Sequence, residues 1–187
     1  MNVFLDFGGN KAQGLKSFIS KYNIDKSWII ETFEPDPNCM IEEHVPNLEN
    51  LIVNKKAIWT HTGTVNFSQM IENTEGSSVE CLMSEGVCSD PESESFRKHD
   101  SIITVDCVDI SEVLSKYSNV DFLVVKMDIE GSEFQVLRKA IQDNSIQSID
   151  HLYVEWHWPF VKGESIDTVN DLKSKLTKLN IQHFDWH

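Results

Sequence analysis

The N-terminal segment constrains the fold more than any other part of the chain. An apolar run at residues 3–7 ends in a glycine-rich turn at residues 8–10, as a buried strand does when it enters a tight turn. A helix should follow, because large apolar residues then recur at helical spacing on one face: Leu15, Phe18, Ile19 and Tyr22. A second strand at residues 28–34 is stopped by Pro35. This order predicts a right-handed βαβ unit with parallel strands, and therefore an α/β fold.

The later part of the chain continues the alternation of strands and helices. Residues 120–128 are apolar on both faces until their end, which is typical of a central parallel strand. We expect this strand to lie beside the first one, in a Rossmann-like, mostly parallel sheet with helices on both faces. The other expected strands lie at residues 51–53 with an extension towards Trp59, then at 63–67, 102–105, 151–156 and 181–186. The other expected helices lie at residues 111–117, where Asp109 or Ser111 would be the cap, and at 132–142 and 166–179.

Composition limits the class of partner. The 187 residues predict a single domain over residues 1–187, with a long loop at about residues 72–100 that is rich in Ser, Glu and Gly. The 30 acidic and 16 basic residues give a formal charge of -14, which would repel nucleic acid. No apolar stretch is long enough for a membrane span, and no secretory signal precedes the first strand, so we expect a cytoplasmic protein. The oligomeric state stays open.

Polar residues follow the apolar strands where each of them ends. In open parallel sheets the ligand lies beyond the carboxyl ends of the strands, so these residues are the candidate site. They are Asp6 with Gly8, Gly9 and Asn10, then Glu34, then Lys126, Asp128 and Glu130, and finally Glu155 and His157. The glycines let backbone approach a ligand closely, and Glu34 is placed to accept hydrogen bonds from the two hydroxyls of a ribose. This pattern predicts a nucleoside-containing cofactor.

The turn favours S-adenosylmethionine over NAD. Dinucleotide sites use G-x-G-x-x-G to admit a pyrophosphate, and the string from Gly8 to Gln13 lacks that spacing. The negative charge of Asp6 would also oppose a pyrophosphate, whereas it suits the sulfonium and ammonium groups of S-adenosylmethionine.

Four strings in this order resemble the FkbM-type methyltransferases. They are Phe4–Asn10, Phe33–Pro37, Val125–Glu133 and Tyr153–His157, and the pattern Lys-x-Asp-x-Glu-Gly-x-Glu within the third is the most specific. The resemblance covers the chain from Val3 to about Leu179. It implies a class I methyltransferase fold, S-adenosylmethionine as donor, and a hydroxyl acceptor on a sugar, a glycan or a small metabolite.

The resemblance also implies where the parts of the donor bind. Asp6, Gly8 and Asn10 would border the methionine part, with Gly9 in the same turn. Glu34, followed by Pro35, would hold the ribose, and Ala57 and Ile58, at the end of the third strand, would flank the adenine. Two features depart from the family pattern. Ala12 replaces a usual glycine, which could narrow the methionine cleft, and the chain ends soon after Trp186, so the final antiparallel strand should be missing or short.

A hydroxyl acceptor needs a group that removes its proton. His157 is the preferred base, because the pKa of a histidine lies near neutral pH, and Asp128, Glu155 and Lys126 are further catalytic candidates. Nearby carboxylates would keep Lys126 charged, which makes it a better orienting cation or ion-pair partner than a base. Alternatively Asp128, Glu130, Glu155 and His157 could hold Mg²⁺ or Mn²⁺. The aromatic residues Trp156, Trp158 and Phe160 form either a stacking face for a sugar ring or part of the core.

Two other functions stay open at this point. A module that binds S-adenosylmethionine or a nucleoside without catalysis is compatible with Ala12 and the short C-terminal region. An NAD-dependent oxidoreductase is the third alternative.

Overall fold

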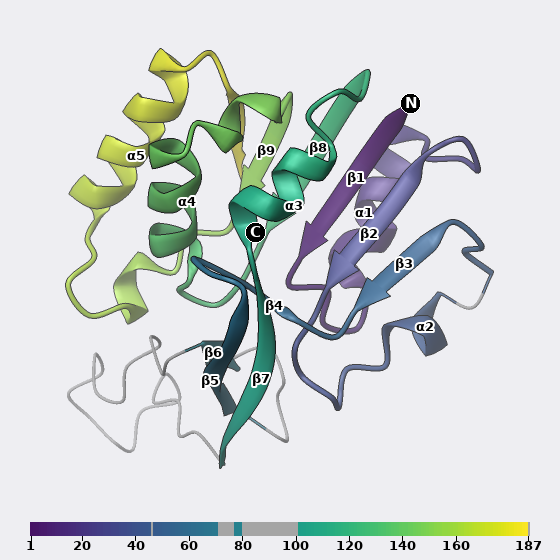
Figure 1. Cartoon of the computed structure of the whole chain (residues 1–187), viewed down its shortest axis with the longest axis horizontal. Coiled ribbons are helices and arrows are strands. Elements are labelled where there is room, and N and C mark those ends of the chain that lie inside the picture. Colours follow the sequence, from purple (N-terminus) through teal and green to yellow (C-terminus); the bar gives the residue numbers. More distant parts are fainter. Residues whose placement is uncertain (46, 71–76, 80–100, 187) are drawn as a thin grey trace.

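The computed structural model describes residues 1–45, 47–70, 77–79 and 101–186, and these build two sheets (Figure 1). The larger sheet has six strands in the order β10-β9-β8-β1-β2-β3, and every neighbouring pair is parallel. Its strands are β1 (Asn2–Phe7), β2 (Ile29–Phe33), β3 (Leu51–Asn54), β8 (Phe122–Met127), β9 (His151–Val154) and β10 (Gln182–Asp185). This topology confirms the predicted Rossmann-like α/β fold.

The expected central strand lies at the centre of this sheet. β8 pairs with β1 along its whole length, in a register that sets Lys126 opposite Asp6. Leu123, Val124 and Val125 are fully buried, because helices cover both faces at this point. The prediction that the strand before Asp128 lies beside the first strand is therefore confirmed.

Two layers of helices flank the parallel sheet. α1 (Gln13–Tyr22) and α2 (Ile41–His44) pack on the face to which Phe4 and Ile30 point. The opposite face, with Val3 and Leu5, is covered by α3 (Ile110–Lys116), α4 (Glu133–Gln142) and α5 (Ile166–Lys178). Two short 3-10 helices, η2 (Ser145–Ser148) and η3 (Trp158–Phe160), complete the described helices. Strand residues alternate between two apolar clusters, as the period of a strand requires.

A second sheet lies beyond the carboxyl ends of the parallel strands (Figure 1). Its order is β4-β7-β5-β6, with β4 (Ala57–Trp59), β5 (Gly63–Gln69), β6 (Ser78–Val79) and β7 (Ser101–Asp109). The expected continuation of the third strand to Trp59 is therefore wrong. β3 ends at Asn54, whose side chain donates hydrogen bonds to Glu31 and to the carbonyl of Thr32. After the exposed Lys55 and Lys56, the chain enters the other sheet.

The C-terminal strand β10 is parallel to β9. Among residues 1–45, 47–70, 77–79 and 101–186, the large sheet contains no antiparallel strand. Most of the predicted loop at residues 72–100 lies outside the described residues, and Ser78 and Val79 within it form β6. None of the described helices is long and apolar enough to cross a bilayer.

Candidate functional site

A cavity of about 530 Å³ lies at the carboxyl ends of β1, β2, β8 and β9, where the second sheet closes it. Its lining includes all but one of the residues predicted from the strand ends: Gly8, Gly9, Asn10, Glu34, Pro35, Ala57, Ile58, Lys126, Asp128, Glu130, Glu155 and His157. Asp6 is the exception. Its side chain is fully buried and contacts Lys126, and it does not belong to the lining. Ala57 and Ile58 line the cavity from β4, not from the end of β3.

Residues 8 and 9 must be glycines because the turn lies very close to two other segments of the chain. Gly8 has a positive φ of 83°, and a Cβ at this position would lie 1.7 Å from the carbonyl oxygen of Asp128. A Cβ on Gly9 would lie 2.3 Å from the hydroxyl oxygen of Thr32. These contacts bring the turn against the ends of β8 and β2, so that three strand ends meet at one edge of the cavity.

Lys126 is an anchored cation. Its Nζ donates to the carbonyl oxygen of Gly8 at 2.7 Å, and lies 3.3 Å from Asp6 and 3.2 Å from Asp128. These partners match the three donors of an ammonium group. Burial lowers the pKa of Lys126, but the attraction of Asp6 and Asp128 outweighs it and raises the pKa above the usual range. Lys126 therefore orients Asp128 and the turn, and it is unsuited to accept a proton.

Glu34 joins the glycine turn to the segment after β2. One carboxylate oxygen accepts a hydrogen bond from the backbone N–H of Asn10 and the other from that of Asp36, both at 2.8 Å. Burial is the main cause that raises the pKa of Glu34, to about 7, although the two N–H donors oppose it. Each carboxylate oxygen keeps a second lone pair, so Glu34 can still accept hydrogen bonds from a ligand in the cavity.

His157 is held in place by a carboxylate that the sequence analysis did not single out. Nδ1 of His157 lies 3.0 Å from Glu133, which is fully buried at the start of α4. Glu133 also accepts hydrogen bonds from the backbone N–H groups of Ile129 and Gly131, each at 3.0 Å. The turn between β8 and α4 is therefore tied to the ring of His157. With Nδ1 directed at Glu133, Nε2 is the ring nitrogen that faces the cavity.

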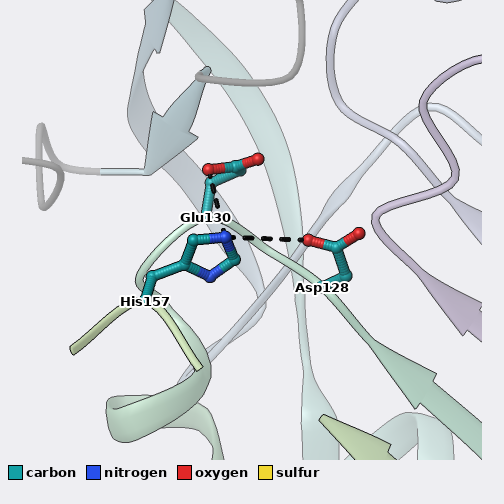
Figure 2. A group of neighbouring side chains, drawn as sticks. All are labelled: Asp128, Glu130 and His157. Carbon is teal, nitrogen blue, oxygen red and sulfur yellow. Dashed lines mark ion pairs between the residues drawn. The ribbon is translucent and has the colours of Figure 1, made fainter. Parts of the chain in front are cut away.

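Three carboxylates surround Nε2 of His157, and Figure 2 shows two of them, Asp128 and Glu130. The distances from Nε2 are 3.4 Å to Glu130, 3.8 Å to Glu155 and 4.0 Å to Asp128. Asp128, Glu130 and His157 each offer one ligand atom, and these atoms lie within 4.8 Å of one another. Glu155 does not belong to this group. Two carboxylate oxygens and one imidazole nitrogen are ligands that suit Mg²⁺ or Mn²⁺.

The pKa of His157 is higher than the value near neutral pH that we expected. Burial lowers the pKa of His157, but Glu133, Glu130 and Asp128 together outweigh it and raise the pKa to about 9. The ring is therefore an imidazolium at neutral pH, and not a group that titrates near 7. The same crowding acts on Glu155, where burial first and Asp128 second raise the pKa. Nε2 can accept a proton only after it has lost its own to solvent.

Aromatic side chains line the cavity beyond the carboxyl ends of β9 and β10. Trp156 and Phe160 from the segment after β9 and Trp186 after β10 belong to the lining, whereas Trp158 does not. The indole N–H of Trp156 donates to Asp185 at 3.1 Å, which orients its ring. All three residues of the predicted aromatic cluster, Trp156, Trp158 and Phe160, pack against the core, and Trp156 and Phe160 also line the cavity.

Two parts of the site were not predicted from the sequence. Glu133 is the last residue of the most specific string, so the motif itself contained the signal, but no pattern showed that it contacts His157. The second sheet adds Phe67 and Val79 to the lining, and Ser77, just before β6, also belongs to it. Nothing in their local sequence pointed to the cavity, because the contact depends on how the second sheet folds over the first.

The comparison with protein families agrees with this geometry. The family model described as Methyltransferase FkbM domain matches residues 6–180. No curated protein and no solved structure gives a significant match to the chain. Since the matched region covers nearly the whole chain, the protein belongs to the FkbM methyltransferase family.

Proposed function

We propose that this protein is an S-adenosylmethionine-dependent O-methyltransferase whose acceptor is a hydroxyl of a sugar, a glycan or a small metabolite. One observation carries the proposal: a single cavity has a buried carboxylate, Glu34, at the end of β2 and the His157 cluster at the end of β9. The first group suits the ribose of the donor, and the second suits a hydroxyl that must lose a proton.

The donor would extend from the second sheet to Lys126. Glu34 accepts hydrogen bonds from the ribose diol, and Gly8, Gly9 and Asn10 border the methionine part. Asp128 lies near the position of the sulfonium, where its negative charge favours the cationic donor over the neutral product. Methyl transfer is an in-line displacement, so much of the catalysis comes from holding the hydroxyl and the methyl group in reach.

The acceptor hydroxyl would lie beside Nε2 of His157. In one form of the mechanism His157, held by Glu133, takes the proton once the ring is neutral, and Glu155 orients the hydroxyl. In the other form Asp128, Glu130 and His157 would hold Mg²⁺ or Mn²⁺, whose charge would make the acceptor hydroxyl more acidic. A cation at this position also neutralises the carboxylates that surround Nε2.

Donor binding tests the first half of the proposal. Titration calorimetry should show binding of S-adenosylhomocysteine and none of NAD. Glu34→Gln should weaken binding by about 1.5 to 3 kcal/mol, the range for hydrogen bonds to a charged group. Because the pKa of Glu34 is about 7, wild-type affinity should fall as the pH drops below 7, and this dependence should vanish in Glu34→Gln. Glu31→Gln is the control, since Glu31 is buried on the same strand but contacts Lys116 and Tyr117 instead of the cavity.

Turnover tests the second half. Transfer of labelled methyl groups to a panel of hydroxyl acceptors should fall by about 10² to 10⁴-fold in His157→Ala, the usual worth of a general base. If His157 acts alone, chelator has no effect and turnover rises with pH towards 9. If a cation takes part, chelator abolishes turnover, Mg²⁺ or Mn²⁺ restores it, and Asp128→Asn is as damaging as His157→Ala. Donor binding without any turnover would leave a binding module as the function.

A further inference from the structure

The segment after the C-terminal strand returns to the cavity. Trp186 directly follows β10 and belongs to the lining, and its side chain is partly buried. Its backbone N–H donates to the carbonyl oxygen of Val154 on β9 at 2.9 Å, and its ring centroid lies 5.0 Å from that of Phe18 on α1. These two contacts hold the indole beside the cavity. Trp186 also lies outside residues 6–180, the region that matches the family model, so family membership assigns it no role.

Two tryptophans approach the cavity from opposite faces of the large sheet. Trp156, after β9, packs against the apolar cluster that contains Phe134 of α4. Trp186 packs against the other cluster, which contains Phe18 of α1. Both tryptophans also line the cavity. A ligand at the carboxyl ends of β9 and β10 would therefore meet one indole from each face of the sheet.

These strand ends lie beside the His157 cluster and not beside Glu34. β10 is parallel to β9, and the residues that follow their last paired positions are Trp186 and Glu155. Glu155 lies 3.8 Å from Nε2 of His157. By contrast, Glu34 follows β2, and β1 and β8 lie between β2 and β9. A molecule in contact with Trp186 would therefore be the acceptor and not the ribose of the donor.

Polar groups lie next to these apolar rings. Asp128, Glu130 and Glu155 each lie within 4.0 Å of Nε2 of His157. Carboxylates accept hydrogen bonds and an imidazolium donates them, so a ligand with several hydroxyl groups along its edge suits this position. An indole, in turn, offers a large flat surface for apolar contact. A pyranose ring has both properties, because its C–H bonds form apolar faces and its hydroxyls lie around the edge.

We propose that Trp186 is an acceptor-binding residue and that the acceptor is a pyranose ring held between Trp186 and Trp156. One hydroxyl at the edge of the ring is directed at Nε2 of His157, and a neighbouring hydroxyl donates to Glu155. This inference rests on the proposed methyltransferase function and narrows its acceptor to a cyclic sugar. An acyclic polyol lacks the flat apolar face and a catechol lacks the further hydroxyls, so both should be poor acceptors.

The class of acceptor is tested by transfer of labelled methyl groups from S-adenosylmethionine. The panel contains the methyl pyranosides of glucose, galactose, mannose and rhamnose, with sorbitol and catechol for comparison. At least one pyranoside should be methylated, and sorbitol and catechol should not. Transfer to sorbitol or catechol alone, or to no compound although S-adenosylhomocysteine binds, would overturn the proposal. If S-adenosylhomocysteine does not bind at all, the proposed function itself fails.

Two aromatic residues of the C-terminal strand provide a matched test of Trp186. Phe184 lies two residues before Trp186 and stacks on Tyr153 at 4.7 Å, but it does not line the cavity. Trp186→Ala should raise KM for the methylated pyranoside by about 10- to 30-fold, the loss expected for one large aromatic contact. It should leave kcat and the affinity for S-adenosylhomocysteine nearly unchanged, because the chemical groups and the donor lie elsewhere in the cavity.

The control variants separate binding from folding. Trp186→Phe should restore most of the affinity for the pyranoside, because a smaller flat ring remains. Phe184→Ala should lower stability to urea and leave KM unchanged. An unchanged KM in Trp186→Ala, or an equal increase in Phe184→Ala, would sink the role of Trp186. A loss of S-adenosylhomocysteine binding in Trp186→Phe, with stability to urea retained, would place Trp186 at the donor instead and contradict the proposal.

Discussion

Glu133 shows how one buried residue governs the behaviour of the site. Its carboxylate accepts from two backbone N–H groups of the turn after β8 and contacts Nδ1 of His157. The negative charge is the largest of the attractions that raise the pKa of His157 against the effect of burial. Glu133 is thus a positioning residue, because it sets both the orientation and the charge of a ring that faces the cavity.

Glu133→Gln should lower the pKa of His157 from about 9, because burial then acts against a weaker attraction. An NMR titration of the imidazole in the metal-free protein measures this change directly. Glu130→Gln is the control, and since Glu130 is a weaker influence on His157 than Glu133, it should give a smaller decrease. A pKa that stays near 9 in Glu133→Gln would contradict the assigned role.

Ala12 also acts differently from the expectation based on its sequence position. It has a φ of 63°, in the left-handed region, at the start of α1. Its side chain is fully buried in the apolar cluster with Leu15 and Phe18, and it does not belong to the lining of the cavity. The methyl group therefore fills the core below α1, and does not narrow the described cavity as we expected.

At the scale of elements, the turns that join strands to helices decide the geometry of the site. α3 begins where one of the two predicted caps, Asp109, accepts a hydrogen bond from the backbone N–H of Ser111 at 2.8 Å. Between β1 and α1 the constraint is steric instead, because the turn packs against the carbonyl of Asp128.

Two glycines with positive φ allow the cost of the backbone conformation to be distinguished from the cost of steric overlap. Gly8 has a φ of 83° and Gly163 one of 87°, but a Cβ on Gly163 would meet nothing within 4 Å. Gly163→Ala should therefore cost only the left-handed conformation, about 1 to 2 kcal/mol in the free energy of unfolding. Gly8→Ala adds the overlap with Asp128 and should cost clearly more, about 4 kcal/mol or above. Urea denaturation compares the two variants, and equal losses would mean that the turn can move away from β8.

At the scale of the whole molecule, protonation of two site residues, Glu34 and His157, stabilises the folded state. The pKa of Glu34 is raised from 4.5 to about 7, and that of His157 from 6.5 to about 9. Both groups bind protons more tightly in the folded state than in the unfolded state. The stability due to His157 is present below pH 6.5 and is lost as the pH rises through 9, and the Glu34 contribution declines between pH 4.5 and 7. The formal charge of -14 adds self-repulsion at neutral pH.

The free energy of unfolding of the ligand-free protein should therefore decrease from pH 5 to pH 9. His157 alone should account for about 3 kcal/mol between pH 6.5 and 9. Urea denaturation at pH 5, 7 and 9 measures the slope, and the variant carrying both Glu34→Gln and His157→Gln should show a much flatter one. Stability that increases with pH over this range would contradict the assigned charges.

The sequence by itself determined the parallel sheet and most strand ends of the site. Apolar runs, glycines and helical spacing are local signals, and parallel strands bring their carboxyl ends to one edge whatever the details of packing. Glu34, Asp128 and His157 could therefore be predicted to meet. Lys126 could be predicted to stay charged, because carboxylates follow it closely in the chain.

Tertiary structure alone decided what depends on contacts between distant segments. The second sheet forms because β5 pairs with β7 across more than thirty residues of chain, and no local pattern specifies that pairing. The contact of Glu133 with His157 joins α4 to the end of β9, and it moves the pKa of His157 away from the value expected for an isolated side chain. Burial and charge act through space, so the protonation of the site follows from the fold and not from the order of residues.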